Sequence, residues 1–301
     1  MRVAVHRRAY RPYEGPLTTE RWRFLVLPRY GLLELFESRA LTAFYVLCFV
    51  PFLVEASAIY IAHSTAARAL FEVRVEASQQ FTHAEFFFGA LTFQGALAFL
   101  LTAWVAPVLV SPDLVNGALP LYLSRPFTRP EYVLGKASSL VALLSLITWV
   151  QGLTLFALQA GLQEGWGGEH LRIAGAIFAG AWVWILILTL IGLALSAWIR
   201  WRVVASGALA GVFFMGSAFG EMWKEILGTS WGRVTNLSYL VGLVWRDLFG
   251  VFTNRQMSRE MFNDGPGRDL PTWAAWAGLM AAALVCVWIL DRRLRAREVV
   301  S

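Results

Sequence analysis

Long apolar runs separated by short polar segments dominate this chain. Six runs have about the 20 residues that a helix needs to cross roughly 30 Å of hydrocarbon. Backbone groups in lipid must be satisfied internally, and no alternating barrel pattern is seen, so the runs are predicted to be helices. They cover residues 40–62, 86–110, 137–160, 173–199, 203–222 and 272–290. The pattern predicts an all-α, polytopic membrane protein whose six transmembrane helices form one domain over residues 40–290.

The segment before the first run, residues 1–39, is polar and basic, and its last part is amphipathic. Over Tyr30–Ala40, apolar side chains such as Leu35 fall on one arc of a helical wheel, and Glu34 and Glu37 lie opposite. This pattern predicts an interfacial helix at the membrane surface, or else an extended start of the first span. No apolar run begins within the first ~30 residues, so we expect no cleaved signal peptide.

The longest polar connection, residues 223–271, separates the fifth and sixth runs. Its first part mixes apolar residues with spaced charges and glycines, and it is too polar for a seventh span. It ends in the turn-rich stretch NDGPGRDLP. We therefore expect a long outer loop that contains a re-entrant or interface-lying pair of helices.

Composition and charge agree with a membrane location. The 301 residues are 57% hydrophobic and 15% charged, whereas soluble domains carry about a quarter charged residues. If the N-terminus is cytoplasmic, most of the 26 Lys and Arg residues lie in cytoplasmic segments, including the basic tail 291–301. This bias predicts a multi-pass protein of the cytoplasmic (inner) membrane with both termini cytoplasmic. The net charge of +6 then reflects topology and lipid headgroups, and we expect no nucleic-acid partner.

Motifs of enzymatic chemistry are incomplete in this chain. Gly135 and Lys136 end like a phosphate-binding loop, but Pro130 and Ala137 occupy its first Gly and its Ser/Thr positions. Residues 228–232 fit G-x-S-x-G, yet no His follows later in the chain to complete a triad. We therefore expect no ATP site, metal or other cofactor in this chain, and no catalytic activity of its own.

One acidic residue falls inside a predicted span. Glu55 lies four residues after Pro51, which is predicted to kink the first span. A carboxylate in hydrocarbon is costly, so Glu55 either faces a polar path within the protein or reaches the outer interface.

The fifth span is rich in glycine. It carries two G-x-x-x-G pairs, Gly207 with Gly211 and Gly216 with Gly220. Small residues one turn apart allow helices to approach closely in lipid. The pattern predicts close packing of this span, either within the chain or across a dimer.

The cytoplasmic segment 111–136 is turn-rich and carries charges of both signs. Ser111-Pro112-Asp113 has the features of a helix start, namely a capping Ser, Pro at the first helical position and an acid near the positive end of the dipole. Gly117 and Pro120 would limit that helix to about two turns. Such a helix below the membrane suits the docking of a cytoplasmic partner; a solvated loop with positive-inside arginines is the alternative.

The order of residues in this segment is more specific than its composition. An acid, a Gly-x-Leu, a second Leu, a Pro-x-x-Arg and a Gly-Lys follow one another. These parts are Asp113, then Gly117 with Leu119, then Leu123, then Pro126 with Arg129, and finally Gly135 with Lys136; Asn116 and Arg125 lie within the same run. This run resembles the first cytoplasmic loop of type-2 ABC transporter permeases, although Ala118 replaces the usual Thr, Tyr122 replaces a Leu, and Pro120 lies inside the helix.

The resemblance implies a permease subunit. Two such subunits, identical or different, would form the membrane path for export, and separate cytoplasmic ATPase subunits would bind ATP and Mg. The segment Asp113–Leu123 would be the coupling helix between them, with Arg125 and Arg129 as anchors. The largely Leu, Ala, Phe and Trp spans, set among membrane lipids, favour an amphiphilic or apolar solute. The alternatives are a membrane-embedded enzyme, a non-ABC carrier, or a scaffold subunit that does not transport.

Overall fold

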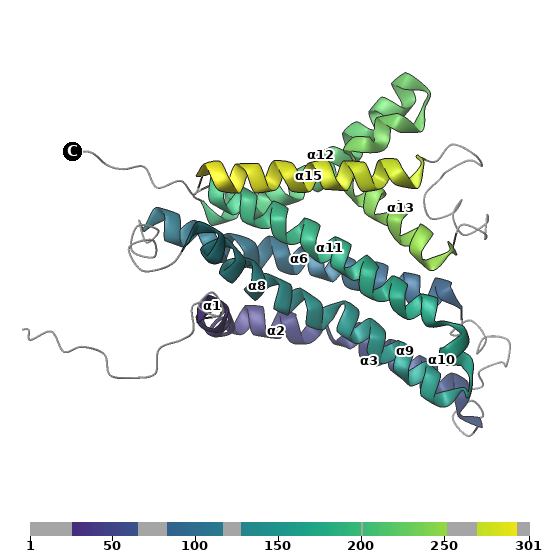
Figure 1. The fold of residues 1–301 in the computed structure, drawn as a ribbon. Helices are drawn as coiled ribbons and strands as arrows, with labels where there is room; N and C mark the ends of the chain where they lie inside the picture. Colours follow the sequence, from purple (N-terminus) through teal and green to yellow (C-terminus); the bar gives the residue numbers. More distant parts are fainter. Residues whose placement is uncertain (1–25, 66–82, 117–127, 200, 252–269, 294–301) are drawn as a thin grey trace, which may run out of the picture.

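The computed structural model describes residues 26–65, 83–116, 128–199, 201–251 and 270–293 (Figure 1). Every element in these ranges is a helix. In chain order they are α1 (Val26–Phe36), α2 (Arg39–Leu47), α3 (Val50–His63), α6 (Ala84–Val115), α8 (Arg129–Ile147), α9 (Trp149–Leu162), α10 (Trp166–Glu169), α11 (Leu171–Trp198), α12 (Arg202–Leu227), η3 (Ser230–Thr235), α13 (Leu237–Phe249) and α15 (Thr272–Arg293).

Six segments of the described chain are long and apolar enough to cross a membrane, which confirms the predicted fold class. They are Arg39–His63, Ala84–Ser111, Pro130–Leu162, Leu171–Trp198, Arg202–Ile226 and Thr272–Arg293. The third begins seven residues before its predicted start, because Lys136 and Glu131 are placed in the first turns of α8 and the hydrophobic run alone does not include them. The spans alternate in direction, so the end of α6, the start of α12 and the end of α15 lie at one end of the bundle (Figure 1).

The helix α11 forms the centre of the bundle. It packs against α6, α8, α9, α12, α13 and α15, and most of its residues are buried. Its contact with α6 is close at Gly192, where an added Cβ would lie 2.8 Å from the Cβ of Ala106 and 3.2 Å from Cγ2 of Thr102. Small residues at this crossing therefore let the two longest helices approach each other.

The first span is interrupted where its sequence predicts a kink. The helix α2 ends at Leu47, and α3 starts at Val50 with Pro51 in its first turn. Proline fits the first turn of a helix, because the missing N–H would have no intrahelical acceptor there. The third span is also broken, at Thr148, whose φ of −116° and ψ of −96° are not helical; the sequence shows no proline at that point.

The amphipathic segment before the first span is a separate helix. It spans Val26–Phe36, so it starts earlier and ends earlier than predicted. Ser38 then caps α2 by accepting a hydrogen bond from the N–H of Leu41 (3.4 Å), which excludes a continuous extension of the span. Figure 1 shows α1 nearly end-on while α2 runs lengthwise, so α1 crosses the direction of the spans as an interfacial helix would.

The described part of the connection between the fifth and sixth spans, up to residue 251, contains the helical elements η3 and α13. After α12 ends at Gly228 in the left-handed conformation (φ 62°), η3 turns the chain and α13 returns into the bundle. The helix α13 packs against α11, α12 and α15. Arg172 satisfies its last turn by donating to the carbonyl oxygens of Asp247 (2.9 Å) and Leu248 (3.1 Å). The described part of this connection is thus helical, and α13 is buried in the bundle rather than lying on its surface.

Candidate functional site

The end of α6 differs from the predicted start of a new helix at Ser111. The helix continues through Ser111, Pro112 and Asp113 to Val115, so the expectation of a capping role for Ser111 is wrong. Its hydroxyl donates instead to the carbonyl oxygens of Ser196 (3.3 Å) and Ile199 (3.2 Å). These carbonyls belong to the last turn of α11 and to the residue that follows it, where the helix itself supplies no donor. Ser111 therefore joins two spans rather than starting a helix.

Asp113 and Lys136, both predicted to belong to the coupling segment, form an ion pair. The Nζ atom of Lys136 lies 2.9 Å from Oδ2 of Asp113, and the side chains are 11% and 15% exposed, respectively. The hydroxyl of Tyr132 donates to the same carboxylate oxygen at 2.8 Å, and its ring lies 5.8 Å from Nζ of Lys136. The three side chains connect the last turn of α6 to the second turn of α8. We call them the Asp113–Tyr132–Lys136 network.

The start of α8 is fixed by its own sequence. The backbone N–H of Thr128 donates to Oε2 of Glu131 at 2.6 Å, and the Thr128 hydroxyl donates to the same oxygen at 2.8 Å. This arrangement is a capping box, with Pro130 at a position that needs no donor. It places Tyr132 and Lys136 one turn apart on the same side of α8. Tyr132 was not among the predicted site residues, although its spacing of four from Lys136 could have indicated it.

Of the other predicted coupling residues, two lie within the described residues. Asn116 follows α6 and is exposed, and Arg129 is the first residue of α8. The remaining ones lie outside the described residues: Gly117, Leu119, Leu123, Arg125 and Pro126. The network therefore holds together the two helix ends from which that connection leaves.

The two glycine pairs of α12 lie in different surroundings. A Cβ added at Gly216 would lie 2.8 Å from the carbonyl oxygen of Thr235, and one at Gly220 would lie 3.1 Å from Asn236. These glycines let η3 approach α12 closely within the chain. A Cβ at Gly207 or Gly211 would meet no atom within 4 Å, so the first pair is open in the single subunit.

Glu55 turns part of its carboxylate into the protein. It lies on the side of α3 that also carries the buried Ile59 and Ala62, and α3 packs chiefly against α9. Its Oε2 atom is buried and makes no hydrogen bond within the described chain. His63 at the end of α3 contacts Gln159 of α9, with 3.4 Å between their Nε2 atoms. Because the two helices run in parallel, residues that precede this contact by eight positions on each helix lie at a similar level, and these residues are Glu55 and Gln151. Both amide atoms of Gln151 are likewise buried without a hydrogen-bond partner in the described residues.

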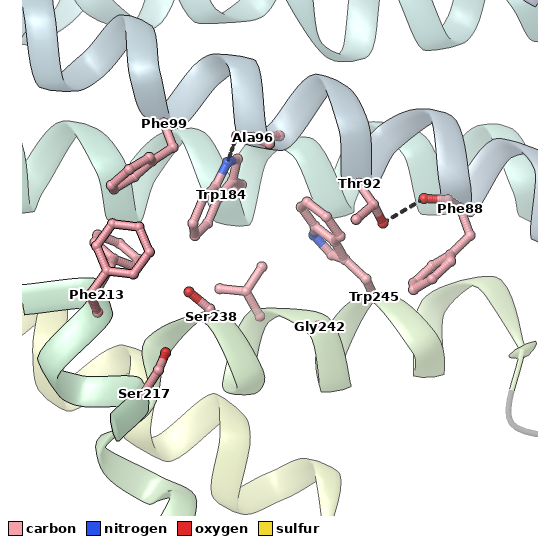
Figure 2. A pocket seen from close by; sticks show the side chains of 13 residues that line it. Phe88, Thr92, Ala96, Phe99, Trp184, Phe213, Ser217, Ser238, Gly242 and Trp245 are labelled. Carbon is pink, nitrogen blue, oxygen red and sulfur yellow. Dashed lines mark hydrogen bonds between the residues drawn. The ribbon is translucent and has the colours of Figure 1, made fainter. Parts of the chain in front are cut away.

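An aromatic pocket of about 330 Å³ lies between α6, α11, α12 and α13 (Figure 2). Figure 2 shows rings from α6 and α11 on one side and Ser217 and Ser238, from α12 and α13, on the other. The ring of Phe213 contacts those of Phe99 (5.2 Å between centroids) and Trp184 (5.5 Å). None of the described residues that line the pocket carries a charge. No sequence pattern indicated this pocket, because its rings come from helices far apart along the chain.

A second, larger cavity of about 660 Å³ lies between α8, α11 and α15, and its lining is almost wholly apolar. Its lining includes Val133 and Ala137 of α8, which directly follow the network residues Tyr132 and Lys136. The described residues form no comparable site for a metal cofactor. Within the described part of the chain, no three His, Cys, Asp or Glu side chains gather as a metal site.

These features define a multi-pass membrane protein in which the polar side chains of Asp113, Tyr132 and Lys136 connect two spans. A family model for ABC-2 family transporter proteins matches residues 33–240, which is more than half of the chain. The chain therefore belongs to the ABC-2 transporter family, as a membrane transport subunit. No individually curated protein matches it.

Proposed function

We propose that this chain is the permease subunit of an exporter that moves an amphiphilic or apolar solute with ATP hydrolysed by a separate cytoplasmic ATPase subunit. Membership of the ABC-2 family supports this, since such permeases work with ABC ATPases. The observation that carries the proposal is the Asp113–Tyr132–Lys136 network, which fastens the ends of two spans beside the segment that resembles the ATPase-docking loop of the family.

The network gives a docked partner a means of moving the spans. A force on the connection between α6 and α8 acts on both helices, because the ion pair prevents their ends from separating. Both helices pack against α11, and α6 and α11 pack closely where Gly192 faces Ala106. Closely packed interiors transmit strain. Movement of the connection, with Arg125 and Arg129 as anchors on the ATPase, thus passes into the central helix. ATP and Mg are bound by the partner, and this chain holds no cofactor.

A second permease subunit completes the membrane path in this proposal. The open pair Gly207 and Gly211 supports this role for α12, because neighbouring side chains on the same helix, including Val203, Phe214 and Met215, are also exposed. Small residues flanked by exposed apolar ones suit close contact between helices in lipid. Membrane lipids cover the remaining apolar surface. Both termini lie on the cytoplasmic side of the inner membrane, as the Lys and Arg bias indicates.

The proposal is tested by recovering the chain with its partners. The tagged chain is expressed together with the proteins encoded beside it, solubilised in mild detergent and purified. We expect an ATP-binding-cassette ATPase to be recovered with it and Mg-dependent ATP hydrolysis in the complex. Recovery without any ATPase would contradict the proposal and would favour the enzyme or scaffold alternatives.

Two variants locate the docking site within that experiment. Asp113→Lys and Arg125→Glu should separate ATP hydrolysis from transport, or reduce ATPase recovery, while the permease remains folded. Glu225→Gln, an exposed charge change at the other end of the bundle, is the control and should leave both unchanged. Normal recovery and coupling in the first two variants would show that the connection is only a solvated loop.

A further inference from the structure

The indole donors of the aromatic pocket are already used within the protein. Nε1 of Trp184 donates to the carbonyl oxygen of Gly95 at 2.8 Å, and Nε1 of Trp245 donates to that of Gly180 at 2.8 Å. The two indole rings meet edge to face with centroids 6.1 Å apart. Because their N–H groups are held by backbone, both side chains offer ring surface to a ligand and no hydrogen-bond donor.

The hydroxyl groups of the pocket show the same bias. Thr92 donates to the carbonyl oxygen of Phe88 at 2.8 Å, and Ser217 donates to Oδ1 of Asn236 at 3.0 Å. Each hydroxyl oxygen keeps lone pairs that can accept a further hydrogen bond. Among the described side chains that line the pocket, Ser238 has a hydroxyl proton for which the described residues show no acceptor.

We propose that this pocket binds a lipophilic organic cation, such as a quaternary ammonium or phosphonium compound with an apolar body. The faces of aromatic rings carry negative partial charge and attract cations within about 6 Å of the ring centre. Hydroxyl lone pairs attract the same charge, whereas an anion would meet few donors to compensate for its lost hydration. A cavity of about 330 Å³ accommodates a drug-sized molecule.

Access from the surface of the bundle fits this ligand. Phe214 lines the pocket and is also strongly exposed in the single subunit, so the pocket opens beside it at the intramembrane surface of α12, next to the face that we assign to the second permease. A lipophilic cation partitions into the membrane and can reach the pocket from there. As a statement about the transported solute the inference rests on the proposed function, but binding itself needs neither ATP nor the partner ATPase.

The test uses two probes of the same shape and opposite charge, tetraphenylphosphonium and tetraphenylborate. The purified full chain is placed in micelles of an uncharged detergent, and binding of each radiolabelled probe is measured by scintillation proximity. We expect saturable binding of the phosphonium at least roughly tenfold tighter than that of the borate, the factor that one good cation–ring contact supplies. Equal affinities, or tighter binding of the borate, would overturn the assignment of charge.

Two substitutions show whether binding occurs in this pocket. Gly242→Leu should abolish phosphonium binding without disturbing the fold, because a Cβ there meets no atom within 4 Å and leucine favours a helix more than glycine does. Phe213→Leu removes one ring and should weaken binding roughly tenfold, and Phe213→Tyr should restore it. Phe178→Leu, which removes a ring of α11 outside the pocket, is the control and should bind as the unchanged chain does.

The outcomes separate this inference from the proposed function. Phosphonium binding that survives Gly242→Leu would place the ligand elsewhere and overturn the inference. Absence of saturable phosphonium binding in a chain that still assembles with its ATPase would also overturn it, while leaving the permease proposal standing.

Discussion

Breaking the ion pair of the Asp113–Tyr132–Lys136 network should destabilise the permease measurably. In Lys136→Met the side chain keeps a similar length but loses its charge, so the Asp113 carboxylate is left with the hydroxyl of Tyr132 as its neighbour. Removing one partner from a fully buried pair costs about 3–5 kcal/mol. The two side chains here are 11% and 15% exposed, so water offsets part of that cost and we expect a loss of about 2–3 kcal/mol.

A double-mutant cycle separates the ion pair from other effects of the substitutions. In Asp113→Asn combined with Lys136→Met neither charge is left unpaired, and Tyr132 can still donate to the amide oxygen. The double variant should therefore lose less free energy of unfolding than the two single variants lose together, and the difference, the coupling free energy, should be about 1–3 kcal/mol. Reversible unfolding by increasing fractions of SDS in mixed micelles, followed by tryptophan fluorescence, provides the free energies. Glu225→Gln should change the free energy of unfolding by less than about 0.5 kcal/mol. A coupling free energy within error of zero would refute the network as a connection between α6 and α8.

Three further predictions follow from the structure. Gly211→Leu should leave the single subunit folded but weaken association of two permeases, whereas Gly216→Leu should destabilise the subunit itself by forcing a side chain against Thr235. The cross-linking yield measures association and the unfolding midpoint measures stability. Equal behaviour of both variants in these assays would contradict the distinction. Glu55→Gln should preserve assembly and alter ATP-driven transport, because the buried carboxylate lies among protein groups; unchanged transport and stability across pH would make Glu55 a bystander. A cysteine at Ser301 should resist an impermeant maleimide in intact cells, with little background from the two buried native cysteines, and efficient labelling there would reverse the topology.

The number of spans could be predicted, and so could their limits to within a few residues apart from the start of the third span, because each depends on local hydrophobicity. Runs of about 20 apolar residues have no other stable arrangement in lipid than a helix. The kink at Pro51 was predictable for the same reason, since proline acts on its own helix. The break at Thr148 was not predictable, because no proline or other helix-breaking residue marks that position in the sequence.

The site was predicted only in part because it depends on contacts between helices. Ser111-Pro112-Asp113 has every local feature of a helix start, yet the carbonyl groups at the end of α11 bind the Ser111 hydroxyl and α6 continues. Asp113 and Lys136 were both named, but their direct pairing, which Tyr132 joins, spans 23 positions and has no signature in sequence. The aromatic pocket combines rings from four helices, and only the fold brings them together.

ATP-driven movement of a solute by the assembled complex tests the central proposal most directly. The permease and its ATPase are reconstituted into liposomes with a fluorescent amphiphile outside, so that complexes whose ATPase faces outward can pump it into the lumen. We predict that external Mg-ATP drives accumulation, that a non-hydrolysable analogue does not, and that Asp113→Lys abolishes it while hydrolysis continues. Equal entry of the amphiphile with ATP, with the analogue and without nucleotide would contradict the assignment of this chain as an ATP-driven permease.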